Sequence, residues 1–396
     1  MRIALVTHKV DFQDGQGRVN YEIAKAALDR GHSVTVIAEY CSSEIANHPR
    51  GRFICAREIP IPTQLLRNIY FAEKSARWLR HHRDEFDIIQ ANGFVTWEPA
   101  DIVAVHFVHS AWLRNPFFPF HWSSFSPYAY YQRLITIING HYEKKAFRSA
   151  DKLIAVSRFT AGEVAEYGIS QEKIVVVHNG VDVEEFHPGS AVRSEFGLSE
   201  EIPLALFVGD IKTTRKNLET VLKAMQSVPE LHLVVAGKVE GSPYPAIAAE
   251  LNVSDRVHFI GKTSKIASLM RSVDFFVFPS RYEAHPLVLL EALASGLPVV
   301  VSGNFGAADY IHAGGKVFDD PNDASALAAI MEELVRFPEK RKSMGAAARE
   351  QALNMQWSQT AAGYLDVYEE LLEKRRQAAS AGHLSMDDAA NSQEKK

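Results

Sequence analysis

The sequence predicts an α/β protein made of two doubly wound, parallel-sheet domains. Short runs of apolar and β-branched residues alternate with helix-like runs along the chain. The alternation stops at residues 179–188, where Gly180, Asp182 and Pro188 indicate a linker, and then restarts. Such alternation is typical of parallel sheets covered by helices on both faces. The 396 residues suit two or three domains at roughly 100–200 residues each.

The first domain opens with an apolar strand at residues 3–7. Val19, Ile23 and Ala26 then recur at helical spacing, and Gly31 lies where that helix is expected to end. The other strands expected in this domain are 34–38, 88–91, 102–106, 153–156 and 174–177.

The second domain repeats the pattern, and Leu218, Val221, Leu222 and Met225 line one face of a predicted helix. Ligands bind such folds beyond the carboxyl ends of the strands, so we expect one cleft between the two domains. The strands expected here are 204–208, 233–236, 257–260, 275–278, 299–301 and 316–318.

A last helix follows Trp357, with an apolar stripe that includes Tyr364 and Tyr368. The residues after it are rich in Ala, Ser, Asp and Gln, which predicts a disordered tail. The expected divisions are 1–185 for the first domain, 186–356 for the second, 357–376 for the C-terminal helix and 377–396 for the tail.

Composition excludes several classes of protein. The 43 Lys and Arg against 48 Asp and Glu give a net charge of −5, which argues against a globally basic nucleic-acid-binding protein. Cys41 and Cys55 form no metal-binding pattern and fit a reducing compartment. No window reaches 18 apolar residues, and the apolar run at residues 1–6 is too short for a signal peptide. We therefore expect a cytoplasmic protein.

Residues 279–302, PSRYEAHPLVLLEALASGLPVVVS, carry the most information about function. An apolar strand ends at Pro279, a polar loop follows, and Pro286 suits the first position of a helix that ends near Gly296. The free N–H groups and the dipole of such a helix start favour an anion such as phosphate. Glu283 and Glu291 would offer carboxylates to sugar hydroxyls. Taken singly, each glutamate also fits an ordinary surface charge.

This string resembles the glutamate–seven–glutamate signature of the retaining glycosyltransferases of family 4, which have the GT-B fold. The resemblance continues through residues 150–157 (ADKLIAVS), 176–186 (VVHNGVDVEEF) and 209–216 (GDIKTTRK), and through residues 15–18 with the turn at 30–32. Each segment is short, but their order along residues 1–370 is specific. The resemblance implies two Rossmann-like domains, with the last helix crossing back onto the first.

The resemblance also implies roles for single residues in binding the donor. Arg215 and Lys216 match the basic pair that holds the donor diphosphate, where cations would stabilise the leaving group. Glu291 matches the residue that binds the ribose hydroxyls, and Glu283 matches a residue near the transferred sugar that we also count as catalytic. The backbone of Leu287 and of Val288 would contact phosphate.

Other matching residues lie in the first domain. Gly15 and Gly17 match a loop that approaches the donor phosphates, where glycine lets the backbone come close; an ordinary turn is the alternative. His106 ends a strand and matches a histidine near the reacting sugar, although such a histidine is also common for structural reasons. We name His109, its rival, and Trp112 as acceptor-binding residues.

Aromatic side chains gather at residues 107–131, with basic residues on either side. This segment predicts either an acceptor site, a surface that meets anionic lipid on the cytoplasmic face of a membrane, or a packed loop beside solvated helices, and these readings stay open. The aromatic residues are Trp112, Phe117, Phe118, Phe120, Trp122, Phe125, Tyr128, Tyr130 and Tyr131, and the flanking basic residues include Arg67, Lys74, Arg77, Arg80, Arg83, Lys144, Lys145 and Arg148.

The sequence departs from the family pattern at three places. Asp210 replaces an arginine that usually follows the loop glycine, so one phosphate contact is in doubt unless Arg215 supplies it. His285-Pro286 replaces the common Phe-Gly, and Pro286 removes an N–H from the phosphate site. Asp14-Gly15 replaces the usual glycine pair.

The sequence argues against two kinds of cofactor site, one for a metal ion and one for NAD. There is no Asp-x-Asp motif, by which transferases of the other major fold hold the diphosphate through a metal ion. Gly15-x-Gly17 with Glu39 imitates an NAD site, but Asn20 replaces the third glycine. We expect neither a metal nor another cofactor, and a nucleoside-diphosphate sugar as co-substrate.

The sequence therefore predicts a metal-independent glycosyltransferase that moves a sugar to a hydroxyl of a saccharide, glycolipid or small molecule with retention of configuration. A phosphate oxygen of the leaving group would accept the acceptor's proton. Bacterial polysaccharide or glycolipid assembly is an expectation from the resemblance alone. The alternatives are a non-catalytic nucleotide-sugar-binding protein of the same fold and a phosphorylase-like enzyme, for which we find no cofactor-lysine context.

Overall fold

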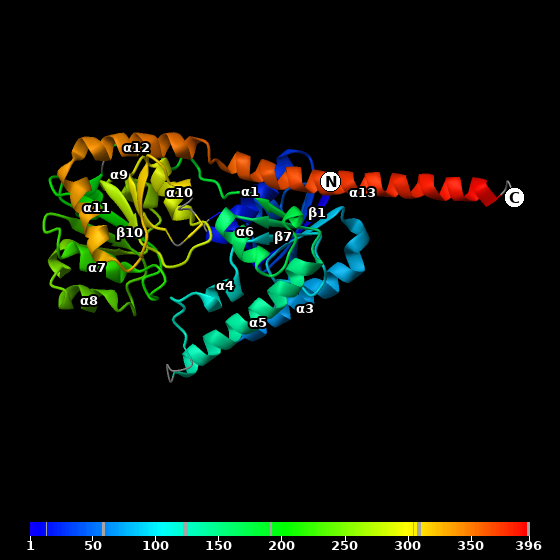
Figure 1. Cartoon of the computed structure of the whole chain (residues 1–396), viewed down its shortest axis with the longest axis horizontal. Helices are drawn as coiled ribbons and strands as arrows, with labels where there is room; N and C mark the ends of the chain where they lie inside the picture. Colours follow the sequence, from blue (N-terminus) through cyan, green and yellow to red (C-terminus); the bar gives the residue numbers. More distant parts are fainter. Residues whose placement is uncertain are drawn as a thin grey trace.

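The chain forms two parallel β-sheets, one after the other, and helices cover both faces of each sheet (Figure 1). The computed structural model describes residues 1–12, 14–57, 60–121, 126–190, 192–303, 305–306 and 310–393, with side chains described as far as residue 380. The fold predicted from the alternation of strands and helices is confirmed.

The first sheet has seven strands, all parallel. Each strand predicted in this half of the chain is present; β5 is an additional edge strand whose half-exposed residues carry no continuous apolar signal. In spatial order the strands are β5 (Gly51–Cys55), β3 (Ser33–Ala38), β1 (Arg2–Val6), β6 (Ile88–Asn92), β7 (Ile102–Val105), β8 (Lys152–Ala155) and β9 (Ile174–Val176). The short strands β2 (Lys9–Val10) and β4 (Tyr40–Cys41) pair separately.

Helices pack on both faces of this sheet because successive strand residues point to opposite sides. Ile3 and Leu5 face α1 (Gly15–Asp29) and α13 (Trp357–Gln393). Ala4 and Val6 face the other core, which contains side chains from α3, α5 and α6. The remaining helices of this domain are α2 (Ser43–Ala46), α3 (Gln64–His82), α4 (His109–Arg114), α5 (Pro127–Ser149) and α6 (Arg158–Ala165).

The second sheet has six strands, also parallel, and all six were predicted. In spatial order they are β12 (Val257–Gly261), β11 (His232–Ala236), β10 (Leu204–Val208), β13 (Phe275–Phe278), β14 (Val299–Ser302) and β15 (Gly315–Phe318). Its helices are α7 (Leu218–Met225), α8 (Tyr244–Glu250), α9 (Ile266–Arg271), α10 (Leu287–Ala294), α11 (Ala324–Arg336) and α12 (Pro338–Leu353).

The chain crosses between the domains twice, and the two crossings touch. The N–H of Val181 donates to the carbonyl of Met355 at 2.9 Å, and the Thr360 hydroxyl donates to the carbonyl of His178 at 2.9 Å. A Cβ at Gly180 would lie 2.5 Å from the backbone nitrogen of Trp357. Glycine is therefore required here by the close approach of the two crossings.

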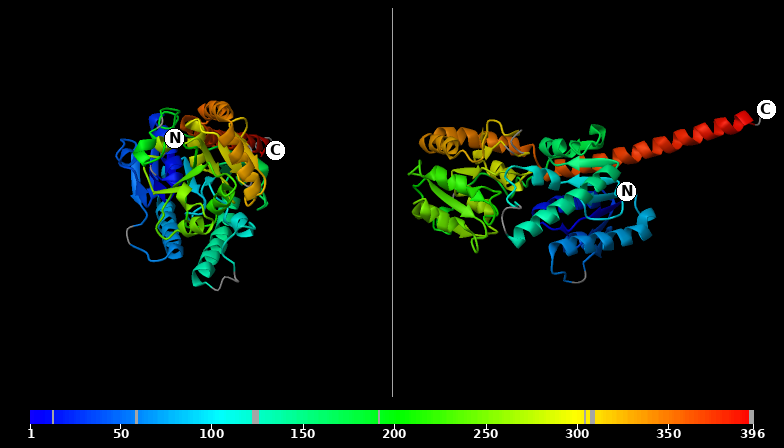
Figure 2. Two further views of the ribbon diagram at one scale, coloured as in Figure 1. Left: turned by 90° about the vertical axis from the view of Figure 1, so that its left-hand side faces the viewer. Right: turned by 60° about the horizontal axis from the view of Figure 1, so that its bottom comes forward.

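Helix α13 brings the end of the chain back to the first domain, where Tyr364, Leu365, Tyr368 and Leu371 join its core. The helix then continues through Gln393 and extends past the domain (Figures 1 and 2). Over residues 377–393 this differs from the prediction of a disordered tail at 377–396, and residues 394–396 lie outside the described chain. The tail contains no proline and several alanines, which favour the helix.

Candidate active site

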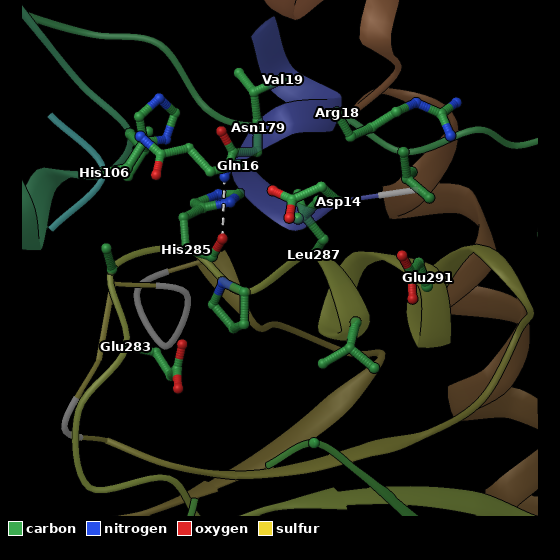
Figure 3. A pocket seen from close by; sticks show the side chains of 18 of the residues that line it. Asp14, Gln16, Arg18, Val19, His106, Asn179, Glu283, His285, Leu287 and Glu291 are labelled. Atoms are coloured by element: carbon green, nitrogen blue, oxygen red, sulfur yellow. Dashed lines mark hydrogen bonds between the residues drawn. The ribbon is translucent and has the colours of Figure 1, made fainter. Parts of the chain in front are cut away.

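A cavity of about 990 Å³ lies between the two domains, at the carboxyl ends of both sheets. Figure 3 shows the start of α1 on one side of it, and the loop after β13 with α10 on the other. Of the predicted site residues, the structure brings together at this cavity Gly15, His106, Arg215, Lys216, Glu283, Leu287, Val288 and Glu291.

The two predicted cations share one carboxylate. Lys216 Nζ lies 2.6 Å from Glu283 Oε1, and the Arg215 guanidinium contacts the same oxygen and donates to the carbonyl of Tyr282 at 3.1 Å. Lys216 Nζ also lies 4.6 Å from the centre of the Phe278 ring. Burial lowers the pKa of Lys216, and Glu283 opposes that shift. The cluster carries two positive charges against one negative charge.

Asn217 holds the loop that carries Arg215 and Lys216 in place, and the sequence analysis did not predict this role. Asn217 is fully buried in a left-handed conformation with φ of 61°. Its Nδ2 donates to the carbonyls of Pro279 at 3.1 Å and Pro321 at 2.5 Å. The tie to Pro279 joins the loop after β10 to the end of β13. An asparagine directly after a basic pair was the available signal, because Asn tolerates this conformation.

Helix α10 begins at the cavity. Pro286 is its capping residue rather than its first helical residue, so Leu287 is the first residue to present an N–H. The first N–H groups of a helix have no acceptor within the helix and carry partial positive charge. Leu287 and Val288 thus add to the positive potential from Arg215 and Lys216.

Glu291 lies on α10, further along the cavity, and faces the start of α1 (Figure 3). Burial raises the pKa of Glu291 to about 7; Glu185 adds to this effect and Arg18 opposes it. Arg18, which sequence analysis did not name as a site residue, donates to Glu22 at 2.6 Å and lies 3.4 Å from Asp182. Its signal was its position directly after the predicted glycine loop.

The two glycines of the first domain differ. Gly15 lines the cavity, and a Cβ there would meet nothing within 4 Å. Gly17 is buried and is not among the lining residues, contrary to the prediction of a donor contact. Its N–H donates to Asp14 Oδ1 at 2.9 Å, and a Cβ would lie 2.8 Å from Asp14 Cβ. The helix cap therefore explains this glycine.

Three polar side chains in one wall of the cavity have unpaired buried atoms (Figure 3). Within the described ranges, His106 Nε2, Asn179 Oδ1 and both ring nitrogens of His285 have no hydrogen-bond partner. Asn179 Nδ2 donates to the carbonyl of His285 at 3.0 Å, which joins the two domains. Burial lowers the pKa of His106 to about 4 and that of His285 to about 3, so both are neutral near pH 7.

A second cavity, of about 570 Å³, adjoins the first and shares Gln16, His106 and Phe107 with it. His109 lines this second cavity. His109 Nδ1 lies 3.1 Å from Glu143 Oε1, and its Nε2 lies 3.3 Å from Asn139 Nδ2. His106 therefore lies between the two cavities, and His109 lies in the second.

Trp112 does not reach either cavity, contrary to its predicted acceptor contact. It is 7 % exposed, and its ring stacks on Tyr282 with centroids 5.0 Å apart. Phe118 packs against the same cluster. Trp112 and Phe118 are thus packed, as expected for the packed-loop alternative, whereas Tyr128 is 63 % exposed. Trp122 and Phe125 lie outside the described residues.

The described part of the chain contains no group of three or more His, Cys, Asp or Glu side chains arranged to hold a metal ion. None of its helices has both the length and the apolar character needed to cross a bilayer.

The chain is similar in sequence to part of several enzymes called D-inositol 3-phosphate glycosyltransferase. A D-inositol 3-phosphate glycosyltransferase of Streptomyces scabiei is 30% identical over 262 residues, covering 61% of this chain and 58% of the relative. The enzyme of the same name from Xylanimonas cellulosilytica is 31% identical over 252 residues, covering 59% and 60%. The match thus spans about three fifths of these relatives.

Solved structures share the fold over nearly the whole chain. WaaG, a glycosyltransferase involved in lipopolysaccharide biosynthesis, has a TM-score of 0.74 at 20% identity, covering 92% of this chain and 99% of WaaG. Sucrose-phosphate synthase from Thermosynechococcus elongatus has a TM-score of 0.75 at 21% identity, covering 94% and 100%. HepE of Anabaena, in complex with UDP-glucose, has a TM-score of 0.70 at 18% identity, covering 93% and 100%.

Two family models match successive parts of the chain. The model described as Glycosyltransferase Family 4 matches residues 13–185, and the model described as Glycosyl transferases group 1 matches residues 190–351. Between them they cover the second sheet, all strands of the first sheet except β1, and most of the residues that line the cavity. The chain belongs to the GT-B glycosyltransferases of family 4.

Proposed function

We propose that this protein transfers a sugar from a nucleoside-diphosphate sugar to a hydroxyl of a saccharide, glycolipid or small-molecule acceptor, without a metal ion and with retention at the anomeric carbon. The observation that carries the proposal is the convergence of Lys216, Arg215 and the start of α10 on one cavity. Cations and helix N–H groups together suit a diphosphate.

The donor would lie along the second domain, which is then the donor-binding domain. Its diphosphate would displace Glu283 from Lys216 and Arg215 and accept from the first N–H groups of α10. The Glu291 carboxylate would accept hydrogen bonds from the ribose hydroxyls. The positive groups would stabilise the charge that develops on the leaving diphosphate.

The acceptor would enter through the second cavity, in the first domain, and meet the donor beside His106. A neutral His106 would hydrogen-bond the transferred sugar rather than remove a proton. A diphosphate oxygen on the departing face would take the proton of the attacking hydroxyl, so that the new bond forms on the side from which the leaving group departs. Closure of the cleft would exclude water, which otherwise hydrolyses the donor.

The donor is tested first among UDP-sugars, because HepE binds UDP-glucose in its crystal structure. A thermal-shift series with UDP-, GDP- and ADP-sugars identifies the nucleotide, since a ligand raises the melting temperature by mass action. NMR of the product of the stabilising donor then gives the anomeric configuration. A product with inverted configuration contradicts retention. A donor that binds but is neither transferred nor slowly hydrolysed favours the non-catalytic alternative.

A surface on α3 and α5 supports a second proposal, that the first domain meets an anionic membrane. The Leu65 N–H donates to Tyr131 Oη at 3.2 Å, which joins the starts of the two helices. Further along α5, His141, Lys144, Lys145 and Arg148 line a basic groove. Apolar side chains beside positive charge suit a lipid surface. The exposed apolar residues are Leu66, Ile69, Tyr128, Leu134 and Ile137.

Vesicle sedimentation tests this contact. Vesicles with phosphatidylglycerol should bind the protein, and phosphatidylcholine vesicles should not. Leu134→Gln with Ile137→Gln should weaken binding while leaving transfer to a soluble acceptor unchanged. Equal sedimentation of wild type and variant with both vesicles contradicts the proposal.

A further inference from the structure

Tyr282 belongs to the second domain by sequence but is buried in the first. It follows β13 in the loop that carries Glu283, and it is 0% exposed. Its ring lies among first-domain aromatic side chains: Trp112 at 5.0 Å, Phe107 at 5.2 Å and Phe159 at 6.0 Å between ring centres. The side chain therefore crosses the boundary between the domains.

The hydroxyl of Tyr282 has a defined partner in the first domain. Tyr282 Oη donates to Glu163 Oε2, on α6, at 3.0 Å. The carbonyl of Val108, which precedes α4, lies 3.4 Å from the same hydroxyl. Glu163 is 9% exposed, and a buried carboxyl without a hydrogen bond is costly, so this contact favours the joined domains.

The backbone of Tyr282 holds the cationic cluster at the same time. Its carbonyl accepts from Arg215 Nη1 at 3.1 Å, and the next residue, Glu283, pairs with Lys216 and Arg215. The Ser280 hydroxyl donates to the carbonyl of Arg215 at 3.1 Å. The loop at residues 280–283 is thus tied on one side to the proposed diphosphate site and on the other to the first domain.

The first-domain end of this connection leads to the second cavity. Helix α4 starts at His109, directly after Val108, and His109 lines that cavity. Glu143 accepts from the backbone N–H of His109 at 2.9 Å and from Tyr167 Oη at 3.1 Å. The side chain of Tyr282 therefore joins the loop that borders one cavity to the helix that borders the other.

We propose that Tyr282, held by Glu163 and the aromatic cluster, is an interdomain positioning residue that fixes Glu283 and Arg215 for transfer when the domains meet. The proposal rests on the proposed function for its effect on catalysis. Its structural part, the tie between the loop and the first domain, stands on the contacts themselves.

Tyr282→Phe and Glu163→Met test the proposal, since the first removes the donor of the hydrogen bond and the second removes its acceptor while keeping a side chain of similar length. Tyr364→Phe is the matched control, because Tyr364 is buried in the first-domain core and its hydroxyl has no partner among the described residues. Hydrogen exchange of the full-length protein is followed in a peptide spanning residues 280–285. Its rate reports how firmly this loop is held to the first domain, and the measurement does not require enzyme activity.

Both variants should speed exchange of that peptide by about ten-fold, the effect of losing a hydrogen bond to a carboxyl group. The double variant should add little to either single change, because one bond is lost in each case. The transfer rate at saturating substrates should fall by a similar factor, while the affinity for the nucleoside diphosphate should fall by less, since Lys216 and the first N–H groups of α10 do not depend on this hydrogen bond.

Unchanged exchange in Tyr282→Phe, or an equal rise in Tyr364→Phe, overturns the proposal. Additive effects of Tyr282→Phe and Glu163→Met also overturn it, because they mean that the two residues act separately. If the wild-type protein transfers no sugar from any donor, the proposed function fails, and the exchange measurement still decides whether Tyr282 ties the loop.

Discussion

Lys216 Nζ lies 2.6 Å from Glu283 Oε1, so the lysine predicted to hold a diphosphate is paired with the carboxylate predicted to lie near the sugar. Both side chains are largely buried, at 12% and 11% exposed. A buried charge needs a partner, and Glu283 supplies it when no diphosphate is bound. In the proposed function, donor binding would therefore exchange one anionic partner of Lys216 for another.

Lys216→Met should lower kcat/KM for transfer by about 100-fold, because a charge-assisted contact to the leaving group in a water-poor site is lost. Lys223→Met is the control, since Lys223 lies exposed on α7 and pairs with Glu219. Steady-state kinetics with one donor make the comparison. Equal activity of the two variants would remove Lys216 from the diphosphate site.

Glu283→Gln should destabilise the ligand-free protein by about 1–3 kcal/mol, because it leaves Lys216 and Arg215 without their countercharge. Added nucleoside diphosphate should then raise the melting temperature more in the variant than in the wild type, since the ligand no longer displaces a carboxylate. Differential scanning calorimetry with and without UDP measures both effects. A smaller ligand shift in the variant means that the diphosphate and Glu283 do not compete.

Glu291 should make nucleotide binding depend on pH. Its pKa is raised to about 7 by burial, with Glu185 adding to the shift and Arg18, itself paired with Glu22 and Asp182, opposing it. Ribose hydroxyls donate to the ionised form, so affinity should rise by about ten-fold from pH 6 to pH 8. Binding should also release a proton, which calorimetry in buffers of different ionisation enthalpy detects.

The Glu291→Gln variant separates this effect from titration of the nucleotide itself. Its affinity should be lower at pH 8 and should lack the Glu291 component of the pH dependence, whereas Glu350→Gln, an exposed change on α12, should behave as the wild type. The raised pKa also acts on stability: the folded form retains a proton that the unfolded chain loses, so the contribution of Glu291 falls as pH rises from about 4.5 through about 7.

Much of the fold was predictable because apolar runs of four or five residues report buried parallel strands. β5 was missed because none of its five residues is fully buried, so it lacks a continuous apolar run. The grouping of Lys216, Glu283 and Glu291 was also predictable, since Lys216 follows β10, Glu283 follows the neighbouring β13, and Glu291 lies on the helix that begins after that second loop. The motif alone predicts this grouping because loops that follow neighbouring parallel strands lie at the same edge of the sheet.

Residues whose role depends on distant contacts were not predictable. Nothing in the sequence around Trp112 indicates that its ring packs on Tyr282, which lies 170 positions later in the chain. Gly17 matched a ligand loop, yet its position is explained by Asp14. Asn217 and Arg18 act through partners in other loops, and single-sequence patterns do not report such pairs.

A chelator should leave the transfer rate within two-fold of its untreated value. The positive groups at the proposed diphosphate site include the side chains of Arg215 and Lys216 and the first N–H groups of α10, and these can balance a leaving diphosphate without an ion. Initial rates with EDTA, and with EDTA followed by excess Mg²⁺, make the test. Loss of activity that Mg²⁺ restores would contradict metal-independent transfer.

His285→Phe should make the protein more stable and less active. Both imidazole nitrogens are buried without a partner in the described chain, and His285 lines the cavity. Removing an unpaired buried polar group should gain about 1 kcal/mol, or roughly 2–4 °C in melting temperature. If the nitrogens serve a sugar hydroxyl, transfer should slow by about ten-fold at the same time. Tyr310→Phe is the control, because Tyr310 packs 5.2 Å from the His285 ring, its hydroxyl has no partner among the residues that the structure describes, and it does not line the cavity. That variant should gain stability and keep its activity. A stabilised His285→Phe with full activity would mean that the imidazole is strained by burial without contacting the substrate.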